Sequence, residues 1–391
     1  MYGELRETCP RPWVDQYDGF WVATKYSDIQ NISQRTDVIS SVKSADPDTG
    51  TETGGVTIPT LQGARSILNE LDSPEWDSVR GFMTRRFSPK AANNLKARTE
   101  QLTNMLIDDV IETGRLDFVE DLTNPLPAIV TVEILGFPID EWKAFSDPIH
   151  LFVSLPRDDP RLAEAAAGIL RFRERVDEEI ALRREQPRDD LLSYFAHGTI
   201  DGSPLSDDLI QDLAWQIMSG GVDTTGSVAA NALLYLGRNA EQRRWLRENR
   251  QHLPRACEEF VRYFTPIQGA GRTLKHDAEI DGWQLSQGDR LLLAYASANR
   301  DPAIFDDPEE VKLDRTPNRH IGYGVGQHRC LGAFMARMMF QCMLDVVLRR
   351  IPDYEIDESG VAGYPSVGFV NGLVHVPATF TPGSVQADEG A

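Results

Sequence analysis

The chain has 391 residues, of which 41% are hydrophobic, so it is long enough to bury a large apolar core. Its 40 basic and 60 acidic residues give a formal net charge of −20, which argues against nucleic acids and anionic membranes as partners. Four cysteines without paired spacing (Cys9, Cys257, Cys330 and Cys342) indicate a reducing compartment rather than a disulfide framework.

Targeting signals are not evident in the sequence. The first residues lack a basic region followed by an apolar run, and no apolar stretch reaches about 18 residues. We therefore expect no signal peptide, no membrane anchor and a cytoplasmic location. Residues 383–391 are small and polar, and we expect them to form a flexible tail.

The first third predicts a short sheet, a long loop and a helix. Residues 19–26 are aromatic and β-branched and predict a strand that leads into a helix. Residues 46–63 are rich in Gly, Thr and Pro, and a loop of this length inside a compact domain is more often functional or mobile than idle. The next helix is predicted to have Ser73 as its N-cap and Pro74 at its first position.

Trp76 and Arg80 are four residues apart and share one face of that helix. A packed Trp beside a solvated Arg is the ordinary interpretation of such a pair. Both side chains are donor-only, so together they also suit a carboxylate. Arg85 and Arg86 follow at the helix end, where they either complement the helix dipole or face a partner protein.

The middle of the chain predicts several amphipathic helices. Residues 96–111 and 120–135 have helical periodicity. Residues 140–155 are apolar and aromatic, residues 156–160 form a Pro-rich turn, and residues 161–185 form a second long helix that is charged on one face. The last three segments predict a helical hairpin.

A further long helix is predicted over residues 204–233, with Ser206 as its cap. Its centre, Ser219 to Gly226, contains poor helix formers, and each Gly costs about 1 kcal/mol relative to Ala. Either this is a simple kink or local propensity is broken for a function.

The last third begins with Glu259 and Arg262, three residues apart on a predicted helix. Their residue types alone fit an ordinary surface ion pair or a bidentate clamp. Residues 279–285 and 289–295 predict a small sheet, and residues 367–373 predict the tip of a hairpin.

A glycine-rich loop ends at a single cysteine. Gly322, Gly324 and Gly326 alternate before Cys330, and the apolar residues that follow recur at helical spacing. Cys330 thus stands where a loop meets a helix N-terminus, which favours a thiolate. Such a cysteine is a nucleophile, a metal ligand or a buried structural residue.

Four motifs together resemble those of the cytochrome P-450 monooxygenases. The segment from Gly324 to Gly332 resembles the haem-binding loop Phe-Gly-x-Gly-x-His-x-Cys-x-Gly, with Tyr323 in place of the usual Phe. The other three occur upstream in the family's order: Trp76-x-x-x-Arg80, Gly220-Gly-x-Asp223-Thr224 and Glu259-x-x-Arg262. Overall spacing is most similar to soluble bacterial members, including the camphor-hydroxylating type.

This resemblance implies a mainly α fold with small β-sheets, a single domain over residues 1–391, and haem between the long distal helix and the Cys-loop helix. Cys330 would be the axial ligand of heme b, with O₂ as co-substrate. Asp223 and Thr224 would deliver protons. Glu259 and Arg262 would clamp the Cys loop, with a further partner near residues 313–319. The other implied cofactor-binding residues are Trp76, Arg80, Arg272, His320, Tyr323, Gly324, His328 and Gly332.

The implied reaction is insertion of one oxygen atom into a compact hydrophobic molecule, with a terpenoid preferred over a polyketide or simple aromatic. Atypical oxidation (desaturation, rearrangement or dealkylation) and a haem sensor without turnover are the alternatives. Gly269 and Gly271 are expected to leave room for substrate. The expected pocket walls are Val56, Ile58, Leu61, Ile217, Gly220, Val222, Ile267, Ala270, Phe369 and Val370.

Electrons must come from outside, because the chain lacks a Cys₄ cluster pattern and has no spare length for a flavin domain. The resemblance implies a ferredoxin and its NAD(P)H-dependent reductase. We expect the ferredoxin to dock on the Cys330 side, at Arg85, Arg86, Arg329 and Arg337.

Overall fold

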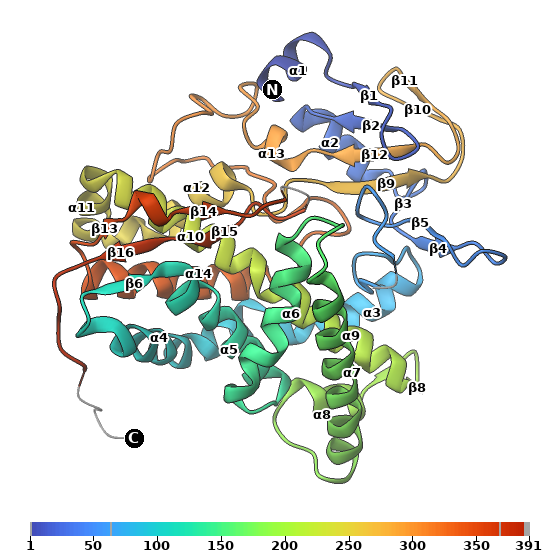
Figure 1. Cartoon of the computed structure of the whole chain (residues 1–391). Coiled ribbons are helices and arrows are strands. Elements are labelled where there is room, and N and C mark those ends of the chain that lie inside the picture. Colours follow the sequence, from blue (N-terminus) through green and yellow to red (C-terminus); the bar gives the residue numbers. More distant parts are fainter. Residues whose placement is uncertain (1, 63–64, 367–368, 387–391) are drawn as a thin grey trace. The chain divides into compact units, whose positions relative to one another are not determined.

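The computed structural model describes residues 2–62, 65–366 and 369–386 (Figure 1). Its contacts divide the chain into two compact units, and each contains segments that are distant in sequence. The first unit comprises residues 1–84, 261–311 and 317–331. The second comprises residues 85–260, 312–316 and 332–391.

The first unit is built on a five-stranded sheet of order β1-β2-β12-β9-β3. Strands β2 and β12 pair in parallel and the other neighbours are antiparallel. Blue and orange strands therefore lie side by side in Figure 1, since they come from distant parts of the chain. The sheet strands are β1 (Trp13–Val14), β2 (Phe20–Ala23), β3 (Ile39–Ser40), β9 (Ala270–Leu274) and β12 (Arg290–Leu293).

The remaining elements of the first unit are short. Its core is formed by apolar side chains such as Ile29, Ile32, Leu291 and Leu293, which are fully buried. The helices are α1 (Tyr2–Thr8), α2 (Tyr26–Gln34), α3 (Glu75–Thr84) and α13 (Tyr295–Ala298). The separate two-stranded pairs are β4 (Lys43–Ala45) with β5 (Glu52–Gly54), and β10 (Ala278–Ile280) with β11 (Trp283–Leu285).

The second unit is mainly helical. Helix α14 packs on α4 and α10, while α7 packs on α6, α8 and α9. Its α-helices are α4 (Pro89–Ile111), α5 (Pro125–Leu135), α6 (Trp142–Ser154), α7 (Leu162–Glu185), α8 (Leu191–Ala196), α9 (Asp207–Gly221), α10 (Asp223–Arg238), α11 (Ala240–Glu248) and α14 (Ala333–Arg350). Helix α12 (Leu253–Phe264) begins in this unit and ends in the first.

Short elements complete the second unit. A π-helical turn, η2, covers Val119–Thr123, and 3-10 turns are η1 (Arg85–Phe87), η3 (Ile139–Glu141), η4 (Arg250–His252) and η5 (Glu358–Gly360). One sheet has the order β13-β16-β6, and β14 pairs with β15 and β7 with β8. These strands are β6 (Arg115–Asp117), β7 (Thr199–Ile200), β8 (Ser203–Pro204), β13 (Glu355–Ile356), β14 (Ala362–Gly363), β15 (Leu373–His375) and β16 (Pro377–Thr379).

Several sequence-based predictions are confirmed. Helices cover all of 96–111, nearly all of 161–185 and most of 120–135 and 140–155. The Ser206 hydroxyl accepts a hydrogen bond from the backbone N–H of Leu209, as expected for an N-cap. Strands β14 and β15 form the predicted hairpin; Val367 and Gly368 of its expected tip, and residues 387–391 of the expected tail, lie outside the described residues.

Other predictions are wrong. Helix α3 begins at Glu75, so Pro74 is not helical and Ser73 is not its N-cap. The stretch 46–63 is a loop in its described residues except for β5, which pairs with β4 across a tight turn of residues 46–51. The predicted sheet of 279–285 and 289–295 is divided, since β10 and β11 pair with each other and β12 joins the larger sheet.

Candidate functional site

The Cys330 loop of the first unit is held by its own backbone. The Cys330 N–H donates to the Tyr323 carbonyl (2.8 Å), and the Gly324 N–H donates to the Ile321 carbonyl (2.9 Å). Gly326 has φ 75°, and a Cβ there would stand 2.4 Å from the Ser33 carbonyl oxygen. Glycine is therefore required where the loop meets the end of α2. The loop presents Cys330 as an exposed residue, and α14 begins three residues later, at Ala333.

A buried cation lies in the same unit. Arg272 on β9 is 3% exposed, and its Nη1 donates to the Gly271 carbonyl (2.6 Å). Among the described residues no carboxylate forms an ion pair with Arg272. Because a buried charge is costly unless it is paired, Arg272 is suited to an anionic group that is not part of the chain.

Trp76, Arg80 and His328 gather beside this arginine. The Trp76 indole N–H donates to the Leu68 carbonyl (3.1 Å), and the Trp76 and His328 rings meet edge to face at 5.6 Å. The Arg80 guanidinium lies 5.7 Å from the Trp76 ring and donates to the Arg329 carbonyl (2.9 Å). The predicted contacts of Trp76 and Arg80 with a carboxylate stay a prediction, because both side chains bind carbonyls here.

His328 is neutral at physiological pH. Burial, followed by the positive charge of Arg272, lowers its pKa to about 4. Its Nδ1 lies 3.2 Å from the Leu68 carbonyl oxygen, which can only accept, so Nδ1 carries the proton. Burial also lowers the pKa of Arg80, although the Cys330 thiolate opposes that shift. The loop is thus surrounded by donors.

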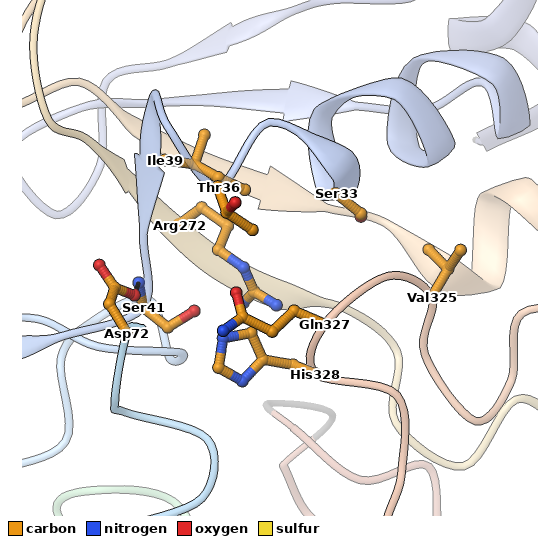
Figure 2. Close-up of a pocket in the computed structure, with 9 residues that line it drawn as sticks. All are labelled: Ser33, Thr36, Ile39, Ser41, Asp72, Arg272, Val325, Gln327 and His328. Atoms are coloured by element: carbon orange, nitrogen blue, oxygen red, sulfur yellow. Dashed lines mark hydrogen bonds between the residues drawn. The ribbon is translucent and has the colours of Figure 1, made fainter. Parts of the chain in front are cut away.

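Figure 2 shows a small pocket toward which the side chains of Arg272, Gln327 and His328 converge. The one carboxylate among its lining residues, Asp72, is matched by the Lys275 ammonium (3.0 Å) and the Ser41 N–H (3.1 Å). The pocket therefore has a positive character. It is lined by Ser33, Thr36, Ile39, Ser41, Asp72, Arg272, Val325, Gln327 and His328.

The remaining predicted loop residues adjoin Cys330. His320 Nδ1 accepts a hydrogen bond from the Gly322 N–H (3.1 Å), and its ring lies 5.8 Å from that of Tyr323. Gly324 has φ 74°, a left-handed conformation that favours glycine. A Cβ at Gly332 would meet no described atom within 4 Å, so no described residue occupies the space beside its Cα.

The predicted long helix of the second unit is broken at Val222, between α9 and α10. This corrects the prediction of one continuous helix, and the break falls inside the segment of poor helix formers. The Thr224 hydroxyl donates to the Gly220 carbonyl (2.9 Å) and so takes up a backbone acceptor beside the break. A Cβ at Gly226 would stand 2.5 Å from the Thr123 carbonyl oxygen, so glycine lets α10 lie against η2.

Asp223 has partners that the sequence did not predict. It is fully buried, and its Oδ1 lies 3.0 Å from Nδ1 of His150 on α6 and 3.5 Å from the Tyr364 hydroxyl. Its Oδ2 is buried and has no hydrogen-bond partner among the residues that the structure describes. His150 was missed because it lies 73 residues from Asp223 in sequence, within the otherwise apolar stretch 148–153 of α6.

The charge of Asp223 influences both neighbours. Burial alone would lower the pKa of His150, but the hydrogen bond and negative charge of Asp223 raise it above its ordinary value. Burial, aided by the same charge, raises the pKa of Tyr364, which therefore keeps its proton at physiological pH. The cluster joins an ionisable pair to a neutral hydroxyl.

Glu259 and Arg262 are each anchored within their own unit. The buried Glu259 carboxylate accepts from Arg315 Nε (2.9 and 3.0 Å) and from the Lys312 N–H (2.8 Å). Arg262, also fully buried, donates to the carbonyls of Asn299, Pro308 and Glu310 at 2.8–2.9 Å. Arg315 confirms the expectation of a further partner within residues 313–319.

The predicted pocket walls of the first unit are brought together around β9. The Gly271 N–H donates to the Val56 carbonyl (2.7 Å), so the segment carrying Val56, Ile58 and Leu61 lies against the strand that carries Ala270. Ile267 is half-buried just before this strand. The expectation that Gly269 and Gly271 leave room is wrong. A Cβ at Gly269 would stand 2.7 Å from the Leu293 carbonyl oxygen, and one at Gly271 would stand 3.0 Å from Arg290.

The predicted walls of the second unit surround the helix break and the segment before β15. Ile217 and Val222 are buried. A Cβ at Gly220 would meet only Gln216 Nε2, at 3.5 Å, so this glycine leaves space. Val370 is buried, Phe369 is half-buried, and Asn231 of α10 fixes the same segment by donating to the Asn371 carbonyl (3.3 Å).

Two of the four arginines expected to face a ferredoxin have internal partners. Arg337 binds the Glu258 carboxylate through two hydrogen bonds (2.7 and 2.8 Å). Arg86 lies 4.3 Å over the Tyr194 ring and 3.8 Å from Asp189. Arg85 and Arg329 are exposed.

Comparison with known proteins defines the class of protein. The family model described as "Cytochrome P450" matches residues 139–352. "Steroid C26-monooxygenase" of Mycobacterium tuberculosis (strain CDC 1551 / Oshkosh) is 31% identical over 377 residues, covering 95% of this chain and 98% of that protein. "Cytochrome P450-terp" of Pseudomonas sp is 28% identical over 384 residues, covering 94% of this chain and 89% of that protein.

Solved structures agree with the sequence relatives. Substrate-free CYP109E1 from Bacillus megaterium matches with a TM-score of 0.87 and 27% identity, covering 98% of each chain. The same enzyme in complex with corticosterone matches with a TM-score of 0.83 and 27% identity, covering 97% of each chain.

The chain is therefore a haem-thiolate monooxygenase of the mainly helical fold with small sheets. It belongs to the cytochrome P450 family, whose members bind haem iron through a cysteine thiolate and use O₂. The first unit has residues that fit this group, since it combines an exposed cysteine with a buried arginine that no described carboxylate pairs. None of the described helices is both long and apolar enough to cross a membrane.

Proposed function

We propose that this P450 hydroxylates a compact hydrophobic molecule and that Cys330 is the thiolate ligand of its haem. The observation that carries the assignment is the glycine loop that presents Cys330 as an exposed residue and carries His328 beside the buried Arg272. Cys257 and Cys342 are buried, and burial raises the pKa of each thiol, so neither is prepared to ligate iron as a thiolate.

Bound heme b supplies the activation of O₂ at its iron. Arg272, Arg80, Trp76 and His320 would hold the propionates, since Arg and the indole N–H are donors suited to carboxylates. Trp76 and Arg80 would exchange their present carbonyl acceptors for a propionate. The neutral His328 donates to a carbonyl and so stiffens the loop around Cys330. Glu259 and Arg262 are both buried and hydrogen-bonded. Glu259 would hold the segment of Lys312 and Arg315, and Arg262 would hold residues 299–310.

Asp223 and Thr224 are proposed to move protons during the reaction. The Thr224 hydroxyl is held at the Gly220 carbonyl, and Asp223 is the buried acid next to it in sequence. A buried acid beside an alcohol suits general acid catalysis through a relay. This intact pair favours turnover over a haem sensor, while atypical oxidation on the same haem stays an alternative outcome.

The substrate is proposed to be a terpenoid, with a steroid as the second candidate. The predicted walls are mainly apolar, and hydrophobic surface is what such a molecule would bury. Relatives support this chemistry: they include steroid C26-monooxygenases and a cytochrome P450-terp, and CYP109E1 has been solved with corticosterone. A polyketide is the third candidate, given the relative "Polyketide biosynthesis cytochrome P450 PksS" of Bacillus subtilis.

Electrons are proposed to come from a ferredoxin reduced by an NAD(P)H-dependent reductase, in the cytoplasm. The exposed Arg85 and Arg329 are the arginines that stay available for docking, because Arg86 and Arg337 have internal partners. Each of these exposed cations would attract an acidic ferredoxin despite the overall charge of −20.

The test is an optical titration of the ferric, haem-loaded protein with terpenoids, steroids, macrolactones, fatty acids and aromatic acids. Displacement of an iron-bound water shifts the Soret band to the blue, and we expect a saturable shift with terpenoids or steroids. The variant C330S should lose the strongly red-shifted band of the ferrous CO complex. C9S, which changes another exposed cysteine, should keep it. A retained band in C330S would refute the ligand assignment.

A further inference from the structure

We propose that His150 supplies protons from solvent to Asp223, and that the charge on its ring sets the pH range in which Asp223 acts. This inference rests on the proposed role of Asp223 and Thr224. It adds a proton-supplying side chain that no motif in the sequence indicates.

Geometry places His150 between Asp223 and water. Asp223 is fully buried, whereas the His150 side chain is 22% exposed and its Nδ1 lies 3.0 Å from Asp223 Oδ1. The other described side chain within hydrogen-bond distance of that carboxylate is Tyr364, which is buried. A proton that reaches Asp223 from solvent through the described side chains therefore passes His150 or Tyr364.

The chemistry of the two side chains favours His150. The pKa of the Tyr364 hydroxyl is raised, so this group does not ionise near neutral pH. An imidazole changes its charge in the physiological range and can carry a proton on either ring nitrogen. Tyr364 instead positions the pair, with its hydroxyl 3.4 Å from His150 Nδ1. A Cβ at Gly372 would stand 2.3 Å from the Tyr364 ring, so only a glycine at this position lets the ring pack where it does.

The surroundings of His150 favour its cationic form. Asp223 on α10, Glu120 on η2 and Asp147 on α6 itself are the charged groups that act on it, and all three are acidic. Asn124 approaches Nδ1 at 3.5 Å and is neutral. These carboxylates more than offset the burial of the ring, so it keeps its proton to a higher pH than an ordinary histidine does.

The transfer conserves protons. The imidazolium passes its Nδ1 proton to the Asp223 carboxylate, which then gives that proton up toward Thr224, and the ring is left neutral with its proton on Nε2. The neutral ring then regains one proton from water, which its partly exposed side chain contacts. No electron moves, and each cycle brings one solvent proton to Asp223.

A second His–Asp pair provides a matched control. His375 Nδ1 lies 3.0 Å from Asp117 Oδ2, the same separation as in the His150–Asp223 pair, but the His375 side chain is 47% exposed. The variant H375Q therefore removes an equal contact in the same unit without touching Asp223.

The first measurement is an NMR titration of labelled histidines in the ferrous CO protein. The chain has seven histidines, so H150Q identifies the relevant signal. We expect the His150 pKa to lie above its ordinary value in the wild type and to fall in D223N. An unchanged His150 titration in D223N would overturn the inference, and this comparison does not depend on how well H150Q folds.

The second measurement is the pH dependence of turnover and of product formed per NADH consumed. General acids contribute about 10²–10⁴-fold to rate, and we expect H150Q to lose roughly tenfold, because water can partly replace a group that acts through another. H150Q should also lose the inflection that marks His150, while H375Q keeps the wild-type profile.

The outcomes separate this inference from the proposed function. A wild-type profile in H150Q, together with loss of product in D223N, would refute the role of His150 and keep that of Asp223. Wild-type product yield in D223N would refute the proton delivery by Asp223 and the inference that depends on it.

Discussion

Adjacent glutamates on α12 provide a sharp test of how burial determines the strength of an ion pair. Glu258 and Glu259 each bind an arginine through two hydrogen bonds. The Glu259–Arg315 side chains are 0% and 6% exposed, whereas the Glu258–Arg337 side chains are 27% and 21% exposed. The perturbation is E259Q, with E258Q as its control.

The expected losses of unfolding free energy in E259Q and E258Q differ several-fold. E259Q removes the carboxylate charge that faces the buried Arg315 and weakens the bond from the Lys312 N–H. Breaking a buried pair in this way costs about 3–5 kcal/mol. E258Q leaves Arg337 in contact with water, and exposed pairs contribute about 0–1 kcal/mol. Since whole domains are stable by roughly 5–15 kcal/mol, E259Q should remove a large share of the total.

The assay is chemical denaturation of the haem-loaded variants, followed by tryptophan fluorescence and by the Soret band. We expect the unfolding midpoint of E259Q to fall steeply and its haem to be released at lower denaturant. E258Q should unfold close to the wild type. If the two variants differ by less than 1 kcal/mol in unfolding free energy, the argument from burial is wrong.

Three further predictions follow from the second unit. G226A should lose about 1–3 kcal/mol in denaturation despite its better helix propensity, because the new Cβ would stand 2.5 Å from the Thr123 carbonyl oxygen; unchanged stability would mean that α10 shifts freely. T224A should consume O₂ without matching product, measured with an oxygen electrode and chromatography, and preserved coupling would exclude the relay. The raised pKa of His150 means that its pair with Asp223 stabilises the fold fully below about pH 6.5 and less as pH rises through the folded-state pKa. The melting temperatures of wild type and H150Q should therefore converge at high pH, and a constant difference would contradict this.

Local chemistry made much of the site predictable. The alternating glycines before Cys330 are needed because the left-handed φ of Gly324 and Gly326 and the close approach to Ser33 admit little else. Ser206 likewise caps the helix that begins at the next residue, and the poor helix formers before Gly226 lie at the break that they favour. Such features are encoded by neighbouring residues, so the family, the cysteine loop and the position of the acid and the alcohol were predictable from the amino-acid sequence.

Tertiary structure decided which distant side chains meet. His150 is the one polar residue of the apolar stretch 148–153, and packing of α6 against α10 brings it to Asp223. Arg315 becomes the partner of Glu259 through a segment 56 residues away. The space beside Gly269 is filled by backbone from another strand. Burial, and with it the charge state of each group, depends on contacts between remote segments, which no local pattern encodes.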